Sequence, residues 1–360
     1  MISVAGHLPF TCRQRQQQPL ELPMRIQKLV LPMAVSAVSL ALSGNAMAET
    51  WKMAVGDAAG GTQYELGKTF AELIEEKTDG DVTVDLFPNG QLGSEQDTVN
   101  NASMGLLDLS IVAINNITPF SPTVGVLTLP YVIQGAEDAK LLTQGEVGEE
   151  LAENTIRDAG VRLLGWAYSG CRRLTNSARP VAEPADLDGL VIRVPKNEIM
   201  ISAYQSWGVN PNPLAWSETF TALQQGVVDG QDNPYITIDA MKFYEVQDYV
   251  TDSCYVFSLE PLIIGEGQFQ SLSPELQAAV LEAGQEATEH SYNYLLESEE
   301  AIKQRLVEEH GMEIVEPAND EQEWIELATG IWPDFYDSIG GKEKLDEVLA
   351  TLGREPAPEQ

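Results

Sequence analysis

The sequence predicts an α/β protein built from two lobes, with strands that cross between the lobes and a long helix that spans them. Three observations lead to this prediction. Strand-like and helix-like stretches alternate from residue 51 onward, two long apolar strands lie far apart, and a helical pattern covers residues 273–310. Strands that alternate with helices favour a mainly parallel sheet that is covered on both faces.

The first lobe opens with a strand, a helix and a second strand. Alternation at 51–55 predicts a strand, apolar residues at helical spacing over 64–74 predict a helix, and 82–86 alternates again. A second helical stretch ends at Gly105, and 107–114 predicts a further strand. Sheets of this kind bind ligands beyond the carboxyl ends of their strands, so we expect binding residues in the loops that follow them.

The chain is expected to cross between the lobes at two apolar strands, 161–168 and 255–265. Between them, 191–194 predicts a short strand, and helical spacing returns in 199–207 and 216–228. The predicted division is lobe I at 49–170 plus about 259–298, and lobe II at 171–258 plus about 299–360.

The long helix has clear end signals. Ser273 and Pro274 are typical of a helix start, and Gly311 follows the last helical residue. At about 1.5 Å per residue the helix would be roughly 50 Å long, which is enough to contact both lobes.

Residues 1–48 are interpreted as a leader with a signal peptide that starts at Met24. A basic start and an apolar run over 29–42 are followed by Ala46-Met47-Ala48, a small-x-small site, so cleavage is expected after Ala48. A membrane span needs about 20 apolar residues, so an uncleaved anchor is the less favoured alternative. The rest of the chain is therefore expected to leave the cytoplasm.

Two cysteines, Cys171 and Cys254, remain after the leader. In an oxidising compartment they could form a disulfide, or they could stay as two buried free thiols. The distance between their Cα atoms would decide between these alternatives.

The chain is strongly acidic, with 55 acidic and 21 basic residues and a net charge of −34 at pH 7. A nucleic-acid partner is excluded, because phosphate binding needs a basic surface. The acidic residues are spread along the chain, which indicates surface solvation. An anionic ligand would therefore need a local cluster of arginines.

The sequence contains no recognisable catalytic motif. His290 and His310 are the only histidines after the leader, and a phosphate loop, a dinucleotide fingerprint, a zinc-protease helix and a nucleophile elbow are all absent. We therefore expect no enzyme activity, no cofactor and no metal. A secreted hydrolase with paired carboxylates stays an alternative, because acidic residues can meet in space.

A block from Arg173 to Pro234 carries a family resemblance. Its motifs are Ile192-Arg193-Val194-Pro195, Pro213-Leu214-Ala215-Trp216-Ser217-Glu218 and Asp229-Gly230-Gln231-Asp232-Asn233-Pro234, and further matches are Gln91-Leu92-Gly93, Leu129-Pro130-Tyr131 and Lys242-Phe243-Tyr244-Glu245-Val246. Together they resemble the solute-binding subunits of tripartite ATP-independent periplasmic (TRAP) transporters, receptors of the C4-dicarboxylate and sialic acid type. The resemblance covers nearly the whole chain after the leader.

The resemblance implies the two-lobed periplasmic binding protein fold, with hinge strands and a lobe-spanning helix. It also implies a periplasmic, monomeric receptor that closes on a small organic acid, either a sugar acid or a dicarboxylate. The membrane subunits of the transporter would be its partners, with transport driven by an ion gradient. An amine or amino acid ligand is the alternative within the same family.

The resemblance assigns roles to four residues. Arg193 matches the arginine that binds the ligand carboxylate, and a planar guanidinium suits this role because it can form two parallel hydrogen bonds. Arg173 matches a second ligand-facing arginine, although the neighbouring Arg172 leaves that choice open. Asn233 matches an asparagine that also contacts the carboxylate, and Trp216 an aromatic residue that packs against the ligand body. The structural alternatives are a core ion pair for Arg193, a hinge charge for Arg173, a turn for Asn233 and core packing for Trp216.

The far end of the pocket departs from the sialic acid binders. The matching positions are Gly56, Glu95 and Ala113, of which two have no polar side chain, so we expect a different ligand. Glu95 could receive hydroxyl groups or an amine. Further pocket candidates are Asp57, Trp166 and Tyr168, with a solvated acid and core aromatics as the alternative.

Overall fold

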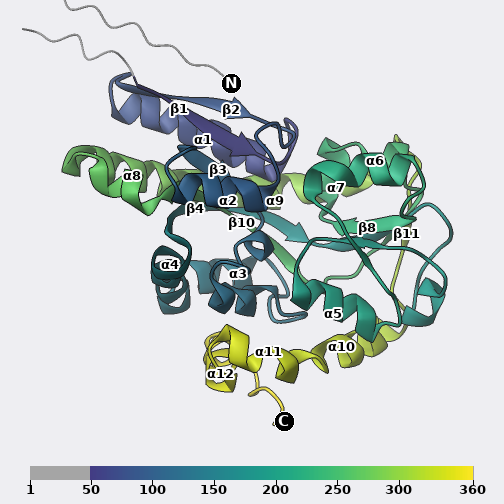
Figure 1. Cartoon of the computed structure of the whole chain (residues 1–360). Coiled ribbons are helices and arrows are strands. Elements are labelled where there is room, and N and C mark those ends of the chain that lie inside the picture. The colour runs from purple at the N-terminus through teal and green to yellow at the C-terminus, as the bar shows by residue number, and fades with distance from the viewer. Residues whose placement is uncertain (1–48, 360) are drawn as a thin grey trace, which may run out of the picture. The chain divides into compact units, whose positions relative to one another are not determined.

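The computed structural model describes residues 49–359 (Figure 1). The leader, the expected start at Met24 and the expected cleavage after Ala48 lie outside these residues. Within the described range, no helix combines the length and the hydropathy that a membrane span requires.

Two sheets and one short strand pair organise the fold. The strands are β1 (Glu49–Val55), β2 (Val82–Phe87), β3 (Leu109–Ile111), β4 (Val161–Cys171), β5 (Arg173–Asn176), β6 (Arg193–Val194), β7 (Asn212–Pro213), β8 (Gly230–Asn233), β9 (Tyr249–Thr251), β10 (Phe257–Gly265) and β11 (Glu313–Val315). The first sheet has the order β2-β1-β3-β10-β4, the second has the order β11-β9-β5-β8, and β6 pairs with β7.

Helices connect most of these strands. The α-helices are α1 (Thr62–Lys77), α2 (Glu95–Ser103), α3 (Ala136–Thr143), α4 (Glu146–Ala159), α5 (Glu198–Ser206), α6 (Thr219–Gln224), α7 (Tyr235–Ala240), α8 (Glu266–Ser271), α9 (Pro274–Glu308), α10 (Gln322–Thr329), α11 (Trp332–Ile339) and α12 (Lys342–Thr351). Short 3₁₀ helices are η1 (Ile114–Asn116), η2 (Pro122–Thr128), η3 (Pro184–Leu187), η4 (Trp216–Glu218), η5 (Phe243–Glu245) and η6 (Ala318–Glu321).

The α/β class is confirmed, and four of the five strands of the first sheet run in the same direction, with β10 as the exception. β1 is parallel to β2 and β3, whereas β10 is antiparallel to β3 and β4. In the second sheet β5 is antiparallel to both β8 and β9. The exception arises because β10 brings the chain back from the second sheet and therefore enters the first sheet from the opposite end.

Helices cover both faces of the first sheet, as predicted. α1 and α9 pack on one face in a core that includes Met53, Phe70 and Ala283. α2, α3 and α4 lie against the other face, where Val99 and Leu151 are buried. The strand residues alternate between these two cores, which follows from the two-residue period of a strand.

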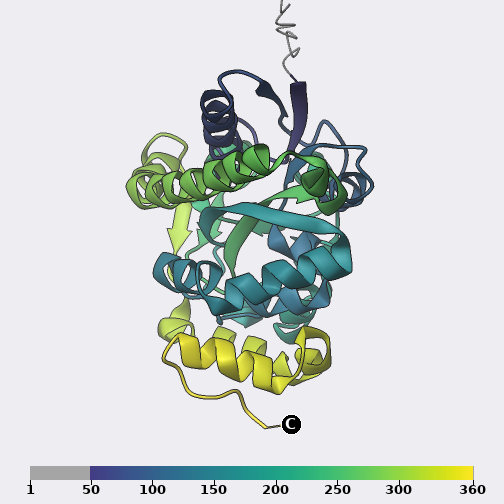
Figure 2. The same cartoon turned by 90° about the vertical axis from the view of Figure 1, so that its left-hand side faces the viewer.

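The long helix α9 confirms the predicted 273–310 segment at 35 residues. Ser273 Oγ accepts a hydrogen bond from Leu276 N at 3.2 Å, and Pro274 is the first helical residue. α9 lies close against β4 (Figures 1 and 2). Glycine at position 284 permits this, because a Cβ atom there would lie 2.0 Å from Leu164 O. It also contacts α7, which follows β8, so one helix contacts the surroundings of both sheets.

The last two helices pack against elements of the expected lobe I. α11 contacts η2, α12 contacts η2 and α3, and Trp332 Nε1 donates to Pro130 O at 3.0 Å. Figure 2 shows these yellow helices beside the blue and teal elements. The sequence placed 299–360 in lobe II, so we propose that α11 and α12 belong with lobe I instead. The other lobe boundaries stay predictions.

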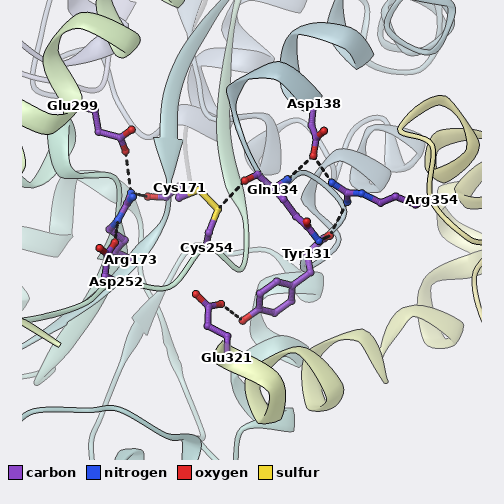
Figure 3. The surroundings of a disulfide bond; sticks show 10 residues. All are labelled: Tyr131, Gln134, Asp138, Cys171, Arg173, Asp252, Cys254, Glu299, Glu321 and Arg354. Carbon is purple, nitrogen blue, oxygen red and sulfur yellow. Dashed lines mark hydrogen bonds and ion pairs between the residues drawn. A yellow bond between two sulfur atoms is a disulfide. The ribbon is translucent and has the colours of Figure 1, made fainter. Parts of the chain in front are cut away.

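Cys171 and Cys254 form a disulfide, with their Cα atoms 4.9 Å apart (Figure 3). Cys171 ends β4 and Cys254 lies three residues before β10, so the bond joins the end of one connecting strand to the segment that leads into the other. Of the two alternatives left open by the sequence, the structure contains the disulfide.

Candidate ligand-binding site

A cavity with an empty volume of about 330 Å³ is lined by elements of the first sheet on one side and of the second sheet on the other. We call the carboxyl groups of Asp57, Glu95 and Glu260 the acidic wall. Arg172 and Arg193 form the arginine wall on the side of the second sheet.

The strand and helix ends of the first sheet position the acidic wall. Asp57 follows β1 by two residues, and Glu260 lies in the middle of β10. Glu95 is the first residue of α2, which begins there because Ser94 Oγ accepts from Asp97 N at 3.2 Å and the Asp97 carboxylate accepts from Ser94 N at 3.3 Å. Asp57 therefore lies beyond the carboxyl end of a parallel strand, where such sheets place their ligands.

Glu95 is held by three donors. Gln63 Nε2 donates to Glu95 Oε1 at 2.9 Å, Asn116 Nδ2 donates to Glu95 Oε2, and the Ala113 backbone NH contributes a longer bond of 3.4 Å. A Cβ atom on Gly56 would lie 3.0 Å from Glu95 Oε1. The small residues at positions 56 and 113 thus leave room for the Glu95 carboxyl group.

Burial raises the pKa of all three acidic-wall carboxyl groups. The pKa of Glu260 rises to about 7, with repulsion from Glu95 adding to burial and a hydrogen bond from Ser169 opposing it. Burial and then repulsion from Glu260 and Glu95 raise the pKa of Asp57 well above its usual value. The pKa of Glu95 is also raised by burial, although its hydrogen bond from Gln63 opposes the shift.

Arg193 is buried, with 2% of its surface exposed, and carries a charge that no carboxylate neutralises directly. Its Nε and Nη2 atoms donate to Leu214 O at 3.1 and 2.8 Å. Among residues 49–359, no carboxylate forms an ion pair with it. Burial and then repulsion from Arg172 lower the pKa of Arg193 to about 10. Because a buried unpaired charge is costly, the site favours an added anion.

Arg172 is the second arginine of the cavity. Its Nε donates to Asp232 Oδ2 at 2.7 Å and its Nη2 donates to Asp232 O at 2.6 Å. Burial alone would lower the pKa of Arg172, but attraction to Asp232 raises it above the usual value. The charge of Arg172 is therefore matched within the protein, unlike that of Arg193.

The prediction that Arg173 faces the ligand needs correction. Arg173 Nε donates to Asp252 at 2.6 Å, its Nη1 lies 3.2 Å from Glu299, and its guanidinium lies 4.1 Å from the centre of the Tyr235 ring. Figure 3 shows the two ion pairs near the disulfide. Consecutive residues of an extended chain point in opposite directions, so Arg172 reaches the cavity and Arg173 does not.

Asn233 and Trp216 line the cavity. The Asn233 side chain donates to Gln231 Oε1. Trp216 Nε1 donates to Gly56 O at 3.1 Å, and the Arg193 guanidinium lies 5.8 Å from the centre of its ring. Trp216 thus connects the arginine wall with the first sheet.

Two polar side chains on the cavity have no partner. Asn115 Nδ2 and Thr237 Oγ1 are buried and form no hydrogen bond with the part of the chain that the structure describes. Buried polar groups in proteins are normally paired, so these two groups are suited to a polar ligand or a water molecule.

The structure places neither Trp166 nor Tyr168 at this cavity, which corrects two further predictions. Trp166 lines a separate cavity between β4, α4 and α9. Tyr168 is fully buried, with its hydroxyl group 2.6 Å from Thr143 Oγ1. Both side chains point from β4 into the core under α3 and α4, as the alternation of that strand requires.

Six polar residues line the cavity without being among the predicted site residues: Gln63, Asn115, Asn116, Arg172, Thr237 and Glu260. Glu260 had a signal, since it is the only charged residue in an apolar strand. Asn115 and Asn116 lie at the end of a predicted strand, where ligands bind in such sheets. Gln63 and Thr237 carry no comparable signal.

Comparisons with known proteins find similarity over most of this chain. The profile described as bacterial extracellular solute-binding protein, family 7, matches residues 54–338. A solute-binding protein of Roseobacter denitrificans is 35% identical over 285 residues, which cover 79% of this chain and 87% of the relative.

Two solved structures are similar over most of their length. A TRAP periplasmic solute binding protein from Roseobacter denitrificans, with bound L-galactonate, is 32% identical, with a TM-score of 0.77, and the match covers 85% of this chain and 99% of that one. One from Sulfurospirillum deleyianum, with bound succinate, is 26% identical, with a TM-score of 0.79, over 84% of this chain and 99% of that one.

Proposed function

The chain belongs to family 7 of the bacterial extracellular solute-binding proteins and is a solute receptor of the TRAP type, and we propose that it captures a small organic carboxylate, either a sugar acid or a dicarboxylate. Receptors of this type deliver their ligand to membrane components of a transporter. We expect this one to leave the ligand chemically unchanged, to use no cofactor or metal, and to act as a monomer.

The observation that carries the proposal is the buried guanidinium of Arg193, which forms no ion pair among residues 49–359. A carboxylate placed there would neutralise a buried charge and accept hydrogen bonds from a planar donor group. The relatives from Roseobacter denitrificans and Sulfurospirillum deleyianum hold L-galactonate and succinate, both of which carry a carboxylate. Arg172 and Asn233 are the neighbouring groups that could share the same anion.

Hydrogen bonds across the cavity support closure around the ligand. Asn197 Nδ2 donates to Asn115 O at 3.1 Å, and Trp216 Nε1 donates to Gly56 O. In each pair, one partner comes from the first sheet and its loops and the other from the segment that follows the crossing strand β4. We propose that these bonds form when the two lobes close as a hinge, which removes water and strengthens the pairing with Arg193.

The site of action follows from the family and the leader together. We propose that the signal peptide directs export and is cleaved after Ala48, so that the mature receptor begins at Glu49 in the periplasm. Mass spectrometry of the mature protein purified from the periplasm would test this by the mass of its N-terminal peptide.

Ligand binding is tested by titration of the purified protein with a panel of sugar acids, dicarboxylates and amines. We expect at least one acid to quench or enhance tryptophan fluorescence, because Trp216 lies on the cavity. The same acid should raise the melting temperature, since a ligand at about 100 times its Kd stabilises the folded state by about 2.7 kcal/mol. Binding of amines alone, or of no acid in the panel, would contradict the proposal.

A further inference from the structure

We propose that the acidic wall makes this receptor specific for monocarboxylic acids whose far end carries hydroxyl groups, and that the same wall rejects a second carboxylate. This inference rests on the proposed function, because it presumes that the first carboxylate binds at Arg193. It narrows the two ligand classes, sugar acids and dicarboxylates, to the first.

The three carboxyl groups are fixed parts of the cavity. Asp57, Glu95 and Glu260 are 1%, 8% and 4% exposed, so none of them can turn out into solvent without a rearrangement of the fold. Glu260 accepts hydrogen bonds from Thr62 Oγ1 and Ser258 Oγ, each at 3.3 Å. A ligand that fills the cavity therefore meets these groups where they are.

The charges of the site suit one ligand carboxylate. Asp232 already matches the charge of Arg172, which leaves Arg193 as the cavity arginine without an ion pair in residues 49–359. A second carboxylate would meet the acidic wall, where every ionised carboxyl group repels it and little water screens the repulsion. A dicarboxylate thus gains at one end and loses at the other.

Hydroxyl groups fit the remaining polar groups. The carboxyl oxygens of the acidic wall accept hydrogen bonds. Asn115 Nδ2 and Thr237 Oγ1, which have no partner within residues 49–359, can donate them. A hydroxyl group both donates and accepts, so a row of them can satisfy both kinds of partner. An ammonium group donates only, and would leave Asn115 Nδ2 without a partner.

A matched series of four-carbon acids tests the inference at about pH 8. D-erythronate, succinate, butyrate and 4-aminobutyrate share their length and one carboxylate and differ in hydroxyl groups, second charge and amine. Galactonate and galactarate form a six-carbon pair that differs only in the terminal group. Calorimetric titration should give Kd values for erythronate or galactonate at least about tenfold below those of the other acids of equal length, the equivalent of about 1.4 kcal/mol.

Neutral variants of the acidic wall should remove the discrimination. In the Asp57→Asn, Glu260→Gln double variant we expect the affinity for succinate relative to erythronate to be at least about tenfold higher than in the wild type. The affinity for galactarate relative to galactonate should rise by a similar factor. Asp85→Asn with Glu153→Gln is the matched control, because both residues are exposed and neither lines the cavity. The control should keep the wild-type ratio between the affinities for the dicarboxylates and for the hydroxy acids of equal length.

The pH dependence gives a test that needs no variant. Glu260 faces Asp57, Glu95, Arg172 and Arg193, and its pKa is about 7. Lowering the pH from about 8.5 to about 6.5 protonates Glu260 and removes negative charge from the wall, so succinate should bind more tightly as the pH falls. Erythronate affinity should change less, and calorimetry in buffers of different ionisation enthalpy should show proton uptake with succinate.

The outcomes separate the inference from the proposed function. If the wild type binds succinate or butyrate as tightly as erythronate, and galactarate as tightly as galactonate, the inference is wrong while the receptor function stands. Preferential binding of 4-aminobutyrate would also overturn it. If no acid of either series binds, the proposed function itself fails.

Discussion

Arg193→Ala is expected to weaken carboxylate binding by at least about 1,000-fold, the equivalent of about 4 kcal/mol. Arg193 is the buried cavity arginine that lacks an ion pair within the described chain, so its loss removes the group that we propose neutralises the ligand carboxylate. The fold should survive, because the substitution removes an uncompensated buried charge and leaves no new one. Calorimetric titration with the acid that binds the wild type most tightly measures the effect.

Two further variants sharpen this experiment. Arg193→Lys keeps the charge but loses the planar pair of donors, so it should bind better than the alanine variant and worse than the wild type. Arg157→Ala removes an exposed arginine that pairs with Asp158 and should leave the affinity unchanged. If the Arg193→Ala protein keeps wild-type affinity and a wild-type melting curve, Arg193 does not bind the ligand carboxylate.

Asp232→Ala is expected to destabilise the folded protein by about 3–5 kcal/mol. Asp232 is fully buried and its carboxylate pairs with the Arg172 guanidinium, so the substitution leaves a buried cation without a counter-ion, held only by the backbone oxygen of residue 232. Chemical denaturation followed by far-UV circular dichroism should show a lower midpoint with a similar slope.

The control for this prediction is the same substitution in an exposed pair. Asp158→Ala breaks the ion pair with Arg157, whose side chain is 64% exposed, and should cost no more than about 1 kcal/mol. The double replacement Arg172→Met, Asp232→Leu should be less destabilising than Asp232→Ala alone, because it leaves no unpaired buried charge. An equal loss in the exposed and the buried pair would contradict the assignment of Arg172 to a buried ion pair.

Much of the fold was predictable because it follows from local patterns. The Ser-Pro start of α9, its length and the glycine after its end were all present in the sequence, and the structure confirms them. The predicted helix over 216–228 is shorter, because η4 precedes α6 and the helix ends at Gln224. The direction of a strand in a sheet depends on contacts between distant parts of the chain, so the antiparallel direction of β10 was not predicted.

The site was predictable where motifs carried it and not elsewhere. The Arg-Val-Pro motif identified Arg193, and the surrounding motifs identified Trp216 and Asn233, which all line the cavity. The choice between Arg172 and Arg173 depended on which of two consecutive side chains faces inward, and a one-residue change of register exchanges them. Trp166 and Tyr168 are aromatic, as expected of residues that pack against a ligand, but their side chains face the core from β4.

The sequence by itself predicted the α/β class and the long helix, which the structure confirms, and it predicted the export signal and the carboxylate-binding role of Arg193, which stay predictions. Each of these depends on neighbours along the chain. Only the tertiary structure decided which carboxyl groups meet. Asp57 follows β1, Glu95 begins α2 and Glu260 lies in β10, so the three are separated by up to 203 residues, and nothing local distinguishes Asp57 from the many solvated acids of this chain. Their convergence results from sheet order and strand direction, and it is this long-range packing that places an acidic wall opposite Arg193.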